Sequence, residues 1–208
     1  MTRTPVRVLL VDDHFMIRMG LSSALGREPD IEVVGEACTG EEALAMFEQL
    51  KPDVTLMDGM LPDIHGVEVT ARILANHPAA RILVVSINNT AEDVHRAIEA
   101  GACGYLLKSS GKRQMIETIR AAAAGQTHLS PELKRKLEER NLYAALSSRE
   151  IEVLRCIAHG KANKEIAGDL KLSELTVKAH ISHILTKLGA SDRTHAVTLA
   201  LERGSLRL

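Results

Sequence analysis

The stretch VRVLLVDD, residues 6–13, closes an apolar run with two aspartates and predicts how the first half of the chain folds. The same arrangement recurs three more times, and each run is short, rich in leucine or β-branched residues, and followed by a helix-like segment. Runs of this kind that alternate with helices predict β-α units around a parallel sheet. The residues that close the four runs are Asp12 and Asp13, Asp58 after DVTLM, Ser86 after RILVV, and Lys108 after GYLL.

Five such units can be placed along the first half of the chain. Helix N-cap signals at Thr39 and Thr90 support two of the helices. The pattern therefore predicts an α/β fold with a five-stranded, doubly wound parallel sheet. We expect strands near residues 6–11, 31–36, 53–57, 81–86 and 103–107, and helices near 14–27, 40–50, 65–76, 91–100 and 112–124.

The polar residues at the ends of the runs should share one pocket, because ligands of parallel sheets bind at the carboxyl ends of the strands. Three carboxylates so close together remain ionised only if they share a hard cation such as Mg²⁺. Asp12 and Asp13 can hold that cation. Asp58 can then act as a nucleophile toward a phosphoryl group whose oxygens are neutralised by Lys108 and Ser86. The sequence predicts that an aspartyl phosphate forms at Asp58.

From about Val6 to Gly125 the chain closely resembles the receiver domain of two-component response regulators. The resemblance implies a flavodoxin-like sheet, Mg²⁺ as the cofactor, and a sensor histidine kinase as the partner. It assigns the phosphoacceptor to Asp58, the switch positions to Ser86 and Tyr105, phosphate binding to Lys108, and Mg²⁺ binding to Asp12, Asp13, Asp58 and the main-chain carbonyl of Met60.

Each of these residues also has a purely structural interpretation. The segment Asp12-Asp13-His14 could simply cap the helix that begins near Phe15, because aspartate favours helix starts. Lys108 could be an ordinary surface lysine, and Tyr105 could simply fill the core. We favour the functional interpretation because five suitable polar residues close four separate strands.

The length of 208 residues and the apolar content of 45% predict two modest cores and hence two domains. No apolar stretch reaches the roughly 20 residues that span a bilayer, and the start MTRTPVR lacks the apolar core of a signal peptide, so we expect a cytoplasmic protein that does not bind membranes. The cysteines Cys38, Cys103 and Cys156 are odd in number and lack CxxC spacing. We expect buried free thiols rather than a redox or zinc site.

Charge separates the chain into an acidic first part and a basic last part. The formal charge is −5 over residues 1–126, +1 over residues 127–145 and +3 over residues 146–208. This asymmetry fits a regulatory domain joined to one that binds a polyanion. The segment between them contains Ser130-Pro131-Glu132, a typical helix start, and predicts a helical linker over residues 127–145.

The last part, residues 146–208, has the pattern of an all-α domain. Ser147 and Glu150 have the spacing of a capping box ahead of an apolar stripe. Further helices are expected from Asn163 to about Leu170, after Ser173 as far as Gly189, and over about 193–203. Four short helices with a tight turn between the second and third predict a helix-turn-helix.

This region resembles the LuxR-type helix-turn-helix of response regulators in the NarL/FixJ class. The resemblance rests on motifs that include Asn163-Lys-Glu-Ile-Ala167 and Thr176-Val-Lys178. It implies that the helix Glu174–Leu188 enters the major groove of DNA. It places the DNA contacts at Lys164, Thr176, Lys178, Ala179 and Ser182.

These features predict a transcription regulator that is controlled by phosphorylation and is not an enzyme. We expect it to bind promoter DNA as a homodimer once activated, with RNA polymerase as a further candidate partner. One alternative keeps DNA binding but makes the receiver a dimerisation module that is independent of phosphorylation. The other is a phosphatase or phosphotransferase with Asp58 as nucleophile, which Met60 disfavours because the phosphatases concerned carry an aspartate there.

Overall fold

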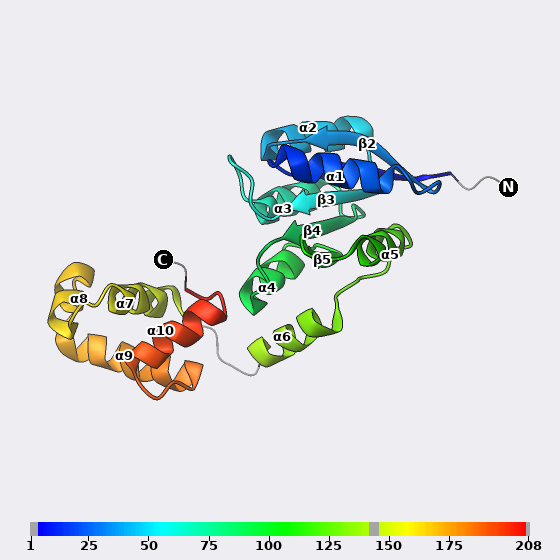
Figure 1. The fold of residues 1–208 in the computed structure, drawn as a ribbon. Helices are drawn as coiled ribbons and strands as arrows, with labels where there is room; N and C mark the ends of the chain where they lie inside the picture. The colour runs from blue at the N-terminus through cyan, green and yellow to red at the C-terminus, as the bar shows by residue number, and fades with distance from the viewer. Residues whose placement is uncertain (1–3, 142–145, 207–208) are drawn as a thin grey trace. The chain divides into compact units, whose positions relative to one another are not determined.

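The computed structural model describes residues 4–141 and 146–206. The chain divides into two compact units, one built around a sheet and one made of helices (Figure 1). Each unit has its own hydrophobic core. The described residues form three apolar clusters rather than the two predicted cores, because the sheet of the first unit is buried on both faces.

The first unit contains a five-stranded sheet in which every strand pair is parallel. The strand order is β2-β1-β3-β4-β5, as expected for a doubly wound sheet of the flavodoxin class. The predicted strands are confirmed with small shifts at their ends. They are β1 (Val6–Val11), β2 (Ile31–Ala37), β3 (Val54–Asp58), β4 (Ile82–Ser86) and β5 (Gly104–Leu107).

Helices cover both faces of this sheet, and alternate strand residues supply two cores. Leu10 packs in the core that includes residues of α1 and α5, whereas its neighbour Leu9 packs in the core that includes residues of α2 and α3. This alternation is the period of two expected for a strand that is buried on both faces. The helices are α1 (Phe15–Leu25), α2 (Gly40–Leu50), α3 (Gly66–Asn76), α4 (Ala91–Glu99) and α5 (Lys112–Ala123).

Side-chain caps hold two of these helices at the predicted positions. The Thr39 hydroxyl accepts a hydrogen bond from the Glu42 N–H at 3.1 Å, and the Thr90 hydroxyl accepts one from the Asp93 N–H at 3.2 Å. Such caps satisfy amide groups that have no partner inside the helix.

A further helix, α6 (Pro131–Asn141), contains the boundary of the two units, which lies between Leu133 and Lys134. It begins at the predicted proline, and the Ser130 hydroxyl accepts a hydrogen bond from the Leu133 N–H at 3.3 Å. Just before it, His128 forms a parallel bridge with Gly104 of β5. The predicted linker also includes residues 142–145, which lie outside the described residues.

The second unit has the four predicted helices. They are α7 (Ser148–Ala158), α8 (Asn163–Leu170), α9 (Glu174–Leu188) and α10 (Arg193–Glu202). The turn between α8 and α9 is tight because Lys171 adopts a left-handed conformation with φ of 54°. Val177, Ile184 and Leu188 hold α9 in the core, and Gly189, with φ of 67°, ends it.

The expectation of buried thiols needs correction. Cys38, Cys103 and Cys156 are free, but each is only partly buried. Cys38 follows β2 near the surface, where its thiol donates a hydrogen bond to the Glu42 carboxylate at 3.1 Å. Among the helices in residues 4–141 and 146–206, none is both long and apolar enough to cross a bilayer.

Candidate functional site

The register of two neighbouring strands brings Asp12 and Asp58 to the same place. In the β1–β3 pair, Val11 lies opposite Met57, so the next residue of each chain segment is an aspartate. The chain leaves β1 and β3 toward opposite ends of the sheet, and ligand sites of doubly wound sheets lie at such a switch point. Both aspartates are 2% exposed.

Lys108 lies between these two carboxylates. Its Nζ is 2.7 Å from Asp58 Oδ2 and 2.7 Å from Asp12 Oδ2. The Lys108 side chain is only 11% exposed, which rules out the alternative of an ordinary surface lysine. Its main-chain N–H donates to the Ser86 carbonyl at 2.8 Å, so the backbone pairing of β4 with the segment after β5 positions the ammonium group.

Burial and hydrogen bonding have opposite effects on the pKa values of Asp58 and Lys108. Burial raises the pKa of Asp58 above its ordinary value, and repulsion from Asp12 adds to that effect; hydrogen bonds from Lys108 and the Met60 N–H only partly offset it. For Lys108, burial favours the neutral form, but hydrogen bonds to Asp12 and Asp58 outweigh it and raise the pKa. The ammonium group therefore remains charged beside the candidate acceptor.

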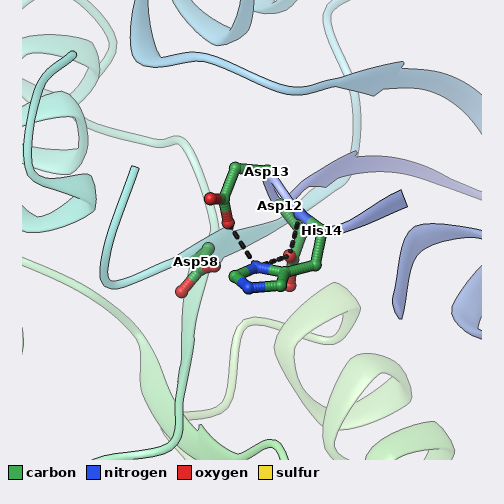
Figure 2. Close-up of side chains that lie close together, drawn as sticks. All are labelled: Asp12, Asp13, His14 and Asp58. Carbon is green, nitrogen blue, oxygen red and sulfur yellow. Dashed lines mark hydrogen bonds and ion pairs between the residues drawn. The ribbon is translucent and has the colours of Figure 1, made fainter. Parts of the chain in front are cut away.

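Asp13 and His14 join Asp12 and Asp58 in an acidic cluster (Figure 2). Asp13 is partly exposed, and its Oδ1 lies 2.5 Å from Nδ1 of His14. One potential ligand atom from each of Asp12, Asp13, His14 and Asp58 lies within 4.8 Å of all the others. The cluster fits a divalent cation, because three carboxylates in such proximity repel one another strongly.

His14 was not among the predicted site residues. It is the N-cap residue of α1, and its side chain makes no capping hydrogen bond. Asp12 instead accepts a hydrogen bond from the His14 N–H at 2.9 Å, which turns the chain and brings the imidazole back over the carboxylates. The pair of residues after β1 is therefore directed toward the sheet edge, and the helix-capping alternative for Asp12 and Asp13 is wrong.

Ser86 and Tyr105 are linked through one peptide segment. The Ser86 hydroxyl accepts a hydrogen bond from the Asn88 N–H at 3.1 Å. The Tyr105 hydroxyl donates to the Asn88 carbonyl at 2.8 Å, and the tyrosine is 2% exposed. Tyr105 therefore fills the core, as its structural interpretation expected, and its hydroxyl is also tied to the loop that leaves Ser86.

The loop after β3 folds tightly against the candidate acceptor. The Met60 N–H donates to Asp58 Oδ1 at 3.1 Å, and the Gly66 N–H donates to the Gly59 carbonyl at 3.2 Å. A Cβ atom at Gly66 would lie 1.8 Å from the Asp58 carbonyl oxygen, so only glycine fits there. The position of the Met60 carbonyl toward a cation stays a prediction.

Large apolar side chains are exposed on the loops and helix that follow β1, β3 and β4. Phe15 and Met16, at the start of α1, are 64% and 68% exposed. Met60 is 49% exposed and Ile87 is 77% exposed, and each lies within two residues of Asp58 or Ser86. The edge of the sheet that holds the acidic cluster thus carries apolar side chains on three separate segments.

The predicted DNA-contacting residues lie on α8 and α9 of the second unit. Lys164, Lys178, Ala179 and Ser182 are exposed, and Thr176 is partly buried, with its hydroxyl 2.8 Å from that of Ser173. Within the described part of the chain, the ammonium groups of Lys164 and Lys178 form no ion pair. Two other lysines of this unit form ion pairs, Lys161 with Asp169 and Lys187 with Glu150.

Comparisons with known proteins agree with both halves of this arrangement. Residues 8–120 match the family model described as the response regulator receiver domain. Residues 144–200 match the model described as bacterial regulatory proteins of the luxR family.

Similar proteins share the whole two-domain organisation. The response regulator protein VraR of Staphylococcus aureus is 39% identical over 207 residues, which cover 97% of this chain and 99% of VraR. The crystal structure of the response regulator ChrA, from a haem-sensing two-component system, is 36% identical, with a TM-score of 0.57 over 97% of this chain and 99% of ChrA. The RcsB response regulator of Salmonella typhimurium is 24% identical and shares the fold, with a TM-score of 0.75 over 93% of this chain and 98% of RcsB. The chain therefore belongs to the LuxR-type family of two-component response regulators, which are DNA-binding transcription regulators rather than enzymes.

Proposed function

We propose that Asp58 accepts a phosphoryl group from a sensor histidine kinase and that this controls the binding of promoter DNA by α9. The observation that carries the proposal is the position of the Lys108 ammonium, 2.7 Å from the carboxylates of both Asp12 and Asp58. A fixed cation at this point can neutralise the charge that develops on a phosphoryl group during transfer to Asp58. Membership of the family excludes the phosphatase alternative.

The transfer requires an unprotonated oxygen on Asp58. That oxygen forms the new O–P bond while the N–P bond to the donor histidine breaks, and the leaving imidazole takes up a proton. Lys108 and the Met60 N–H already bind the two carboxylate oxygens, which fixes the orientation of the group. Ser86 is the last residue of β4, the strand beside β3, and we propose that its hydroxyl turns toward a phosphoryl oxygen.

Mg²⁺ fits the acidic cluster as cofactor. Asp12, Asp13 and Asp58, with the Met60 carbonyl, are the residues that we propose hold it, because oxygen ligands suit this ion. When bound, Mg²⁺ supplies positive charge that polarises the phosphoryl oxygens. Asp12 and Asp13 would then be neutralised by the ion and unable to compete with Asp58 as nucleophiles.

The exposed apolar side chains around the cluster support a protein rather than only a small molecule as the phosphoryl donor. A kinase that places its phosphohistidine at Asp58 must cover the loops that follow β1, β3 and β4. Phe15, Met16 and Ile87 lie on these segments and are more than 60% exposed. Exposed apolar groups of this size are typical of protein interaction sites when they gather around a polar centre.

The link between Ser86 and Tyr105 supports a route from phosphorylation to the surface. If the Ser86 hydroxyl turns to a phosphoryl oxygen, its hydrogen bond with the Asn88 N–H is lost. The carbonyl of Asn88 accepts the hydrogen bond from the Tyr105 hydroxyl, so a movement of this loop changes the environment of the tyrosine. We propose that the receiver surfaces altered in this way form a homodimer, which joins two weak DNA contacts into one strong one.

Lys164 and Lys178 support the placement of α9 in the major groove. Both lysines are exposed and without an ion-pair partner in the described residues, so phosphate contacts would not break an existing pair. Thr176 and Ser182 can add hydrogen bonds that fix the register of the helix on DNA. We further propose a cytoplasmic location, where promoter DNA and RNA polymerase are accessible to such a regulator.

The test of the phosphoryl acceptor is incubation with acetyl phosphate and Mg²⁺, followed by intact-mass measurement. The wild-type protein should gain the mass of one phosphoryl group. Asp58→Ala should gain none because it lacks the nucleophile, and Asp13→Ala should gain little because it lacks a cation ligand. Glu117→Ala removes an exposed carboxylate of α5 and should behave as wild type. A full shift in Asp58→Ala would contradict the assignment.

DNA binding is tested through its salt dependence. Lys178→Ala should weaken binding of all duplexes and reduce the slope of log affinity against log salt by about one, the value of a lost phosphate contact. Lys134→Ala removes an exposed lysine of α6 and serves as a control with the same change in charge. If the two variants have the same affinity and slope, α9 does not lie against the DNA as proposed.

A further inference from the structure

Leu175 is the most exposed large hydrophobic side chain in the described residues, at 78%. It lies in the first turn of α9, which begins at Glu174 and is capped by Ser173. The helix does not need Leu175 for packing, since Val177, Ile184 and Leu188 are its buried residues. An exposed leucine at this point of a helix-turn-helix therefore needs another explanation.

Leu175 shares one face of α9 with the residues proposed to meet DNA. Lys178 and Ala179 follow it by three and four positions, a spacing that places side chains next to one another on a helix. Both are exposed. Leu175 and Ala179 therefore form an apolar patch near the N-terminal end of the helix, and Lys178 lies on the same face.

We propose that Leu175, with Ala179, reads the C5-methyl group of thymine in the major groove, an inference that rests on the proposed placement of α9. The N-terminal side chains of a recognition helix are the ones that reach base edges. The thymine methyl is the apolar group that the major groove offers, and apolar side chains are its usual partners. Leu175 thus selects half-sites that carry thymine at one or two fixed positions.

A protein surface is the competing explanation for an exposed leucine. The neighbour Lys178 argues against it, because lysines are depleted from protein–protein interfaces, whereas an unpaired lysine beside the patch suits a polyanion. Ser182 continues the same exposed face one turn further on with a polar group. The face as a whole combines a cationic, a polar and two apolar side chains, as a groove of bases and phosphates requires.

The experiment removes the methyl group from the DNA and the leucine from the protein. Duplexes retained by the full-length protein from a randomised pool give the preferred half-site, and each thymine in it is then replaced by deoxyuridine, which pairs alike but lacks the methyl. For the wild type, one or two positions per half-site should lose about fourfold in affinity, the value of one buried methyl group. For Leu175→Ala the same replacements should change affinity less than twofold.

Leu201→Ala is the matched control, since Leu201 is an exposed leucine of α10 in the same domain. It should keep the wild-type response to deoxyuridine. The inference is wrong if wild-type affinity does not change with deoxyuridine, or if Leu175→Ala keeps the full loss. It is also wrong if Leu175→Ala changes the mass of the protein in solution without DNA, which would place the leucine in a contact between copies. Retention of no duplex by the wild type would instead contradict the proposed function itself.

Discussion

Gly66 carries no functional group, yet the geometry of the acceptor depends on it. Its N–H binds the Gly59 carbonyl, and its Cα faces the carbonyl of Asp58 at a distance that excludes a Cβ atom. Any larger residue would push the start of α3 away from the end of β3. Because Asp58 is the last residue of β3, this displacement would reach the candidate phosphoacceptor.

Gly66→Ala should therefore lower the free energy of unfolding by about 1–3 kcal/mol, as for overpacking of a well-filled site. Gly20→Ala is a matched control in α1, where a Cβ atom meets nothing within 4 Å. That variant should gain up to about 1 kcal/mol, because alanine is the better helix former. Urea unfolding of the full-length protein measures both, and equal effects of the two substitutions would contradict the packing argument.

Glu150 shows how one side chain can serve two elements. Its carboxylate accepts the Ser147 N–H at 2.7 Å in the capping box of α7, and it pairs with Lys187 of α9 at 2.7 Å. The residue is 3% exposed. Burial alone would raise its pKa, but the hydrogen bonds from Lys187 and Ser147 outweigh burial and lower the pKa below its ordinary value of 4.5. α7 and α9 are therefore joined by a buried charge.

Glu150→Gln keeps a cap acceptor but loses the charge, and should destabilise α7 by about 1.5–3 kcal/mol at pH 7. A carboxylate whose pKa falls on folding stabilises the protein above its unfolded pKa, and this contribution is lost as the pH falls through the folded value. The difference in stability between Glu150→Gln and the wild type should therefore become smaller as the pH is lowered. Hydrogen exchange of the α7 amides in the full-length protein measures the stability of this helix in both proteins. Glu152→Gln removes a half-exposed partner of Arg149 and should cost less than 0.5 kcal/mol.

The elements themselves could be predicted from the sequence, because strand periodicity and helix caps are local signals. The Ser147 capping box and the Lys171 turn are examples, and both are confirmed. The Glu150–Lys187 pair joins residues 37 positions apart and has no local signal. The place of His14 depends on how the chain turns after β1, and the exposure of Leu175 depends on which face of α9 packs inward. These features needed the three-dimensional structure.

At the scale of the whole molecule, the two units have different charges and different tasks. The receiver part, which contains the acidic cluster, has a net charge of −5, and the part with the helix-turn-helix has a net charge of +3. Each has its own core, so each can fold around its own site. The central claim is that one equilibrium connects them, in which phosphorylation of Asp58 favours the form that binds DNA tightly.

The most direct test of this claim is the dissociation constant for a duplex retained from the randomised pool, measured at fixed salt with and without beryllofluoride, which mimics the phosphorylated aspartate. Wild-type protein should bind roughly 5- to 150-fold more tightly with beryllofluoride, as a coupling of about 1–3 kcal/mol gives. Ser86→Ala should show a smaller gain, and Asp58→Ala should show none. Equal dissociation constants for the wild type with and without beryllofluoride, across protein concentrations that span the monomer–dimer transition, would contradict the claim and favour a regulator that binds DNA independently of phosphorylation.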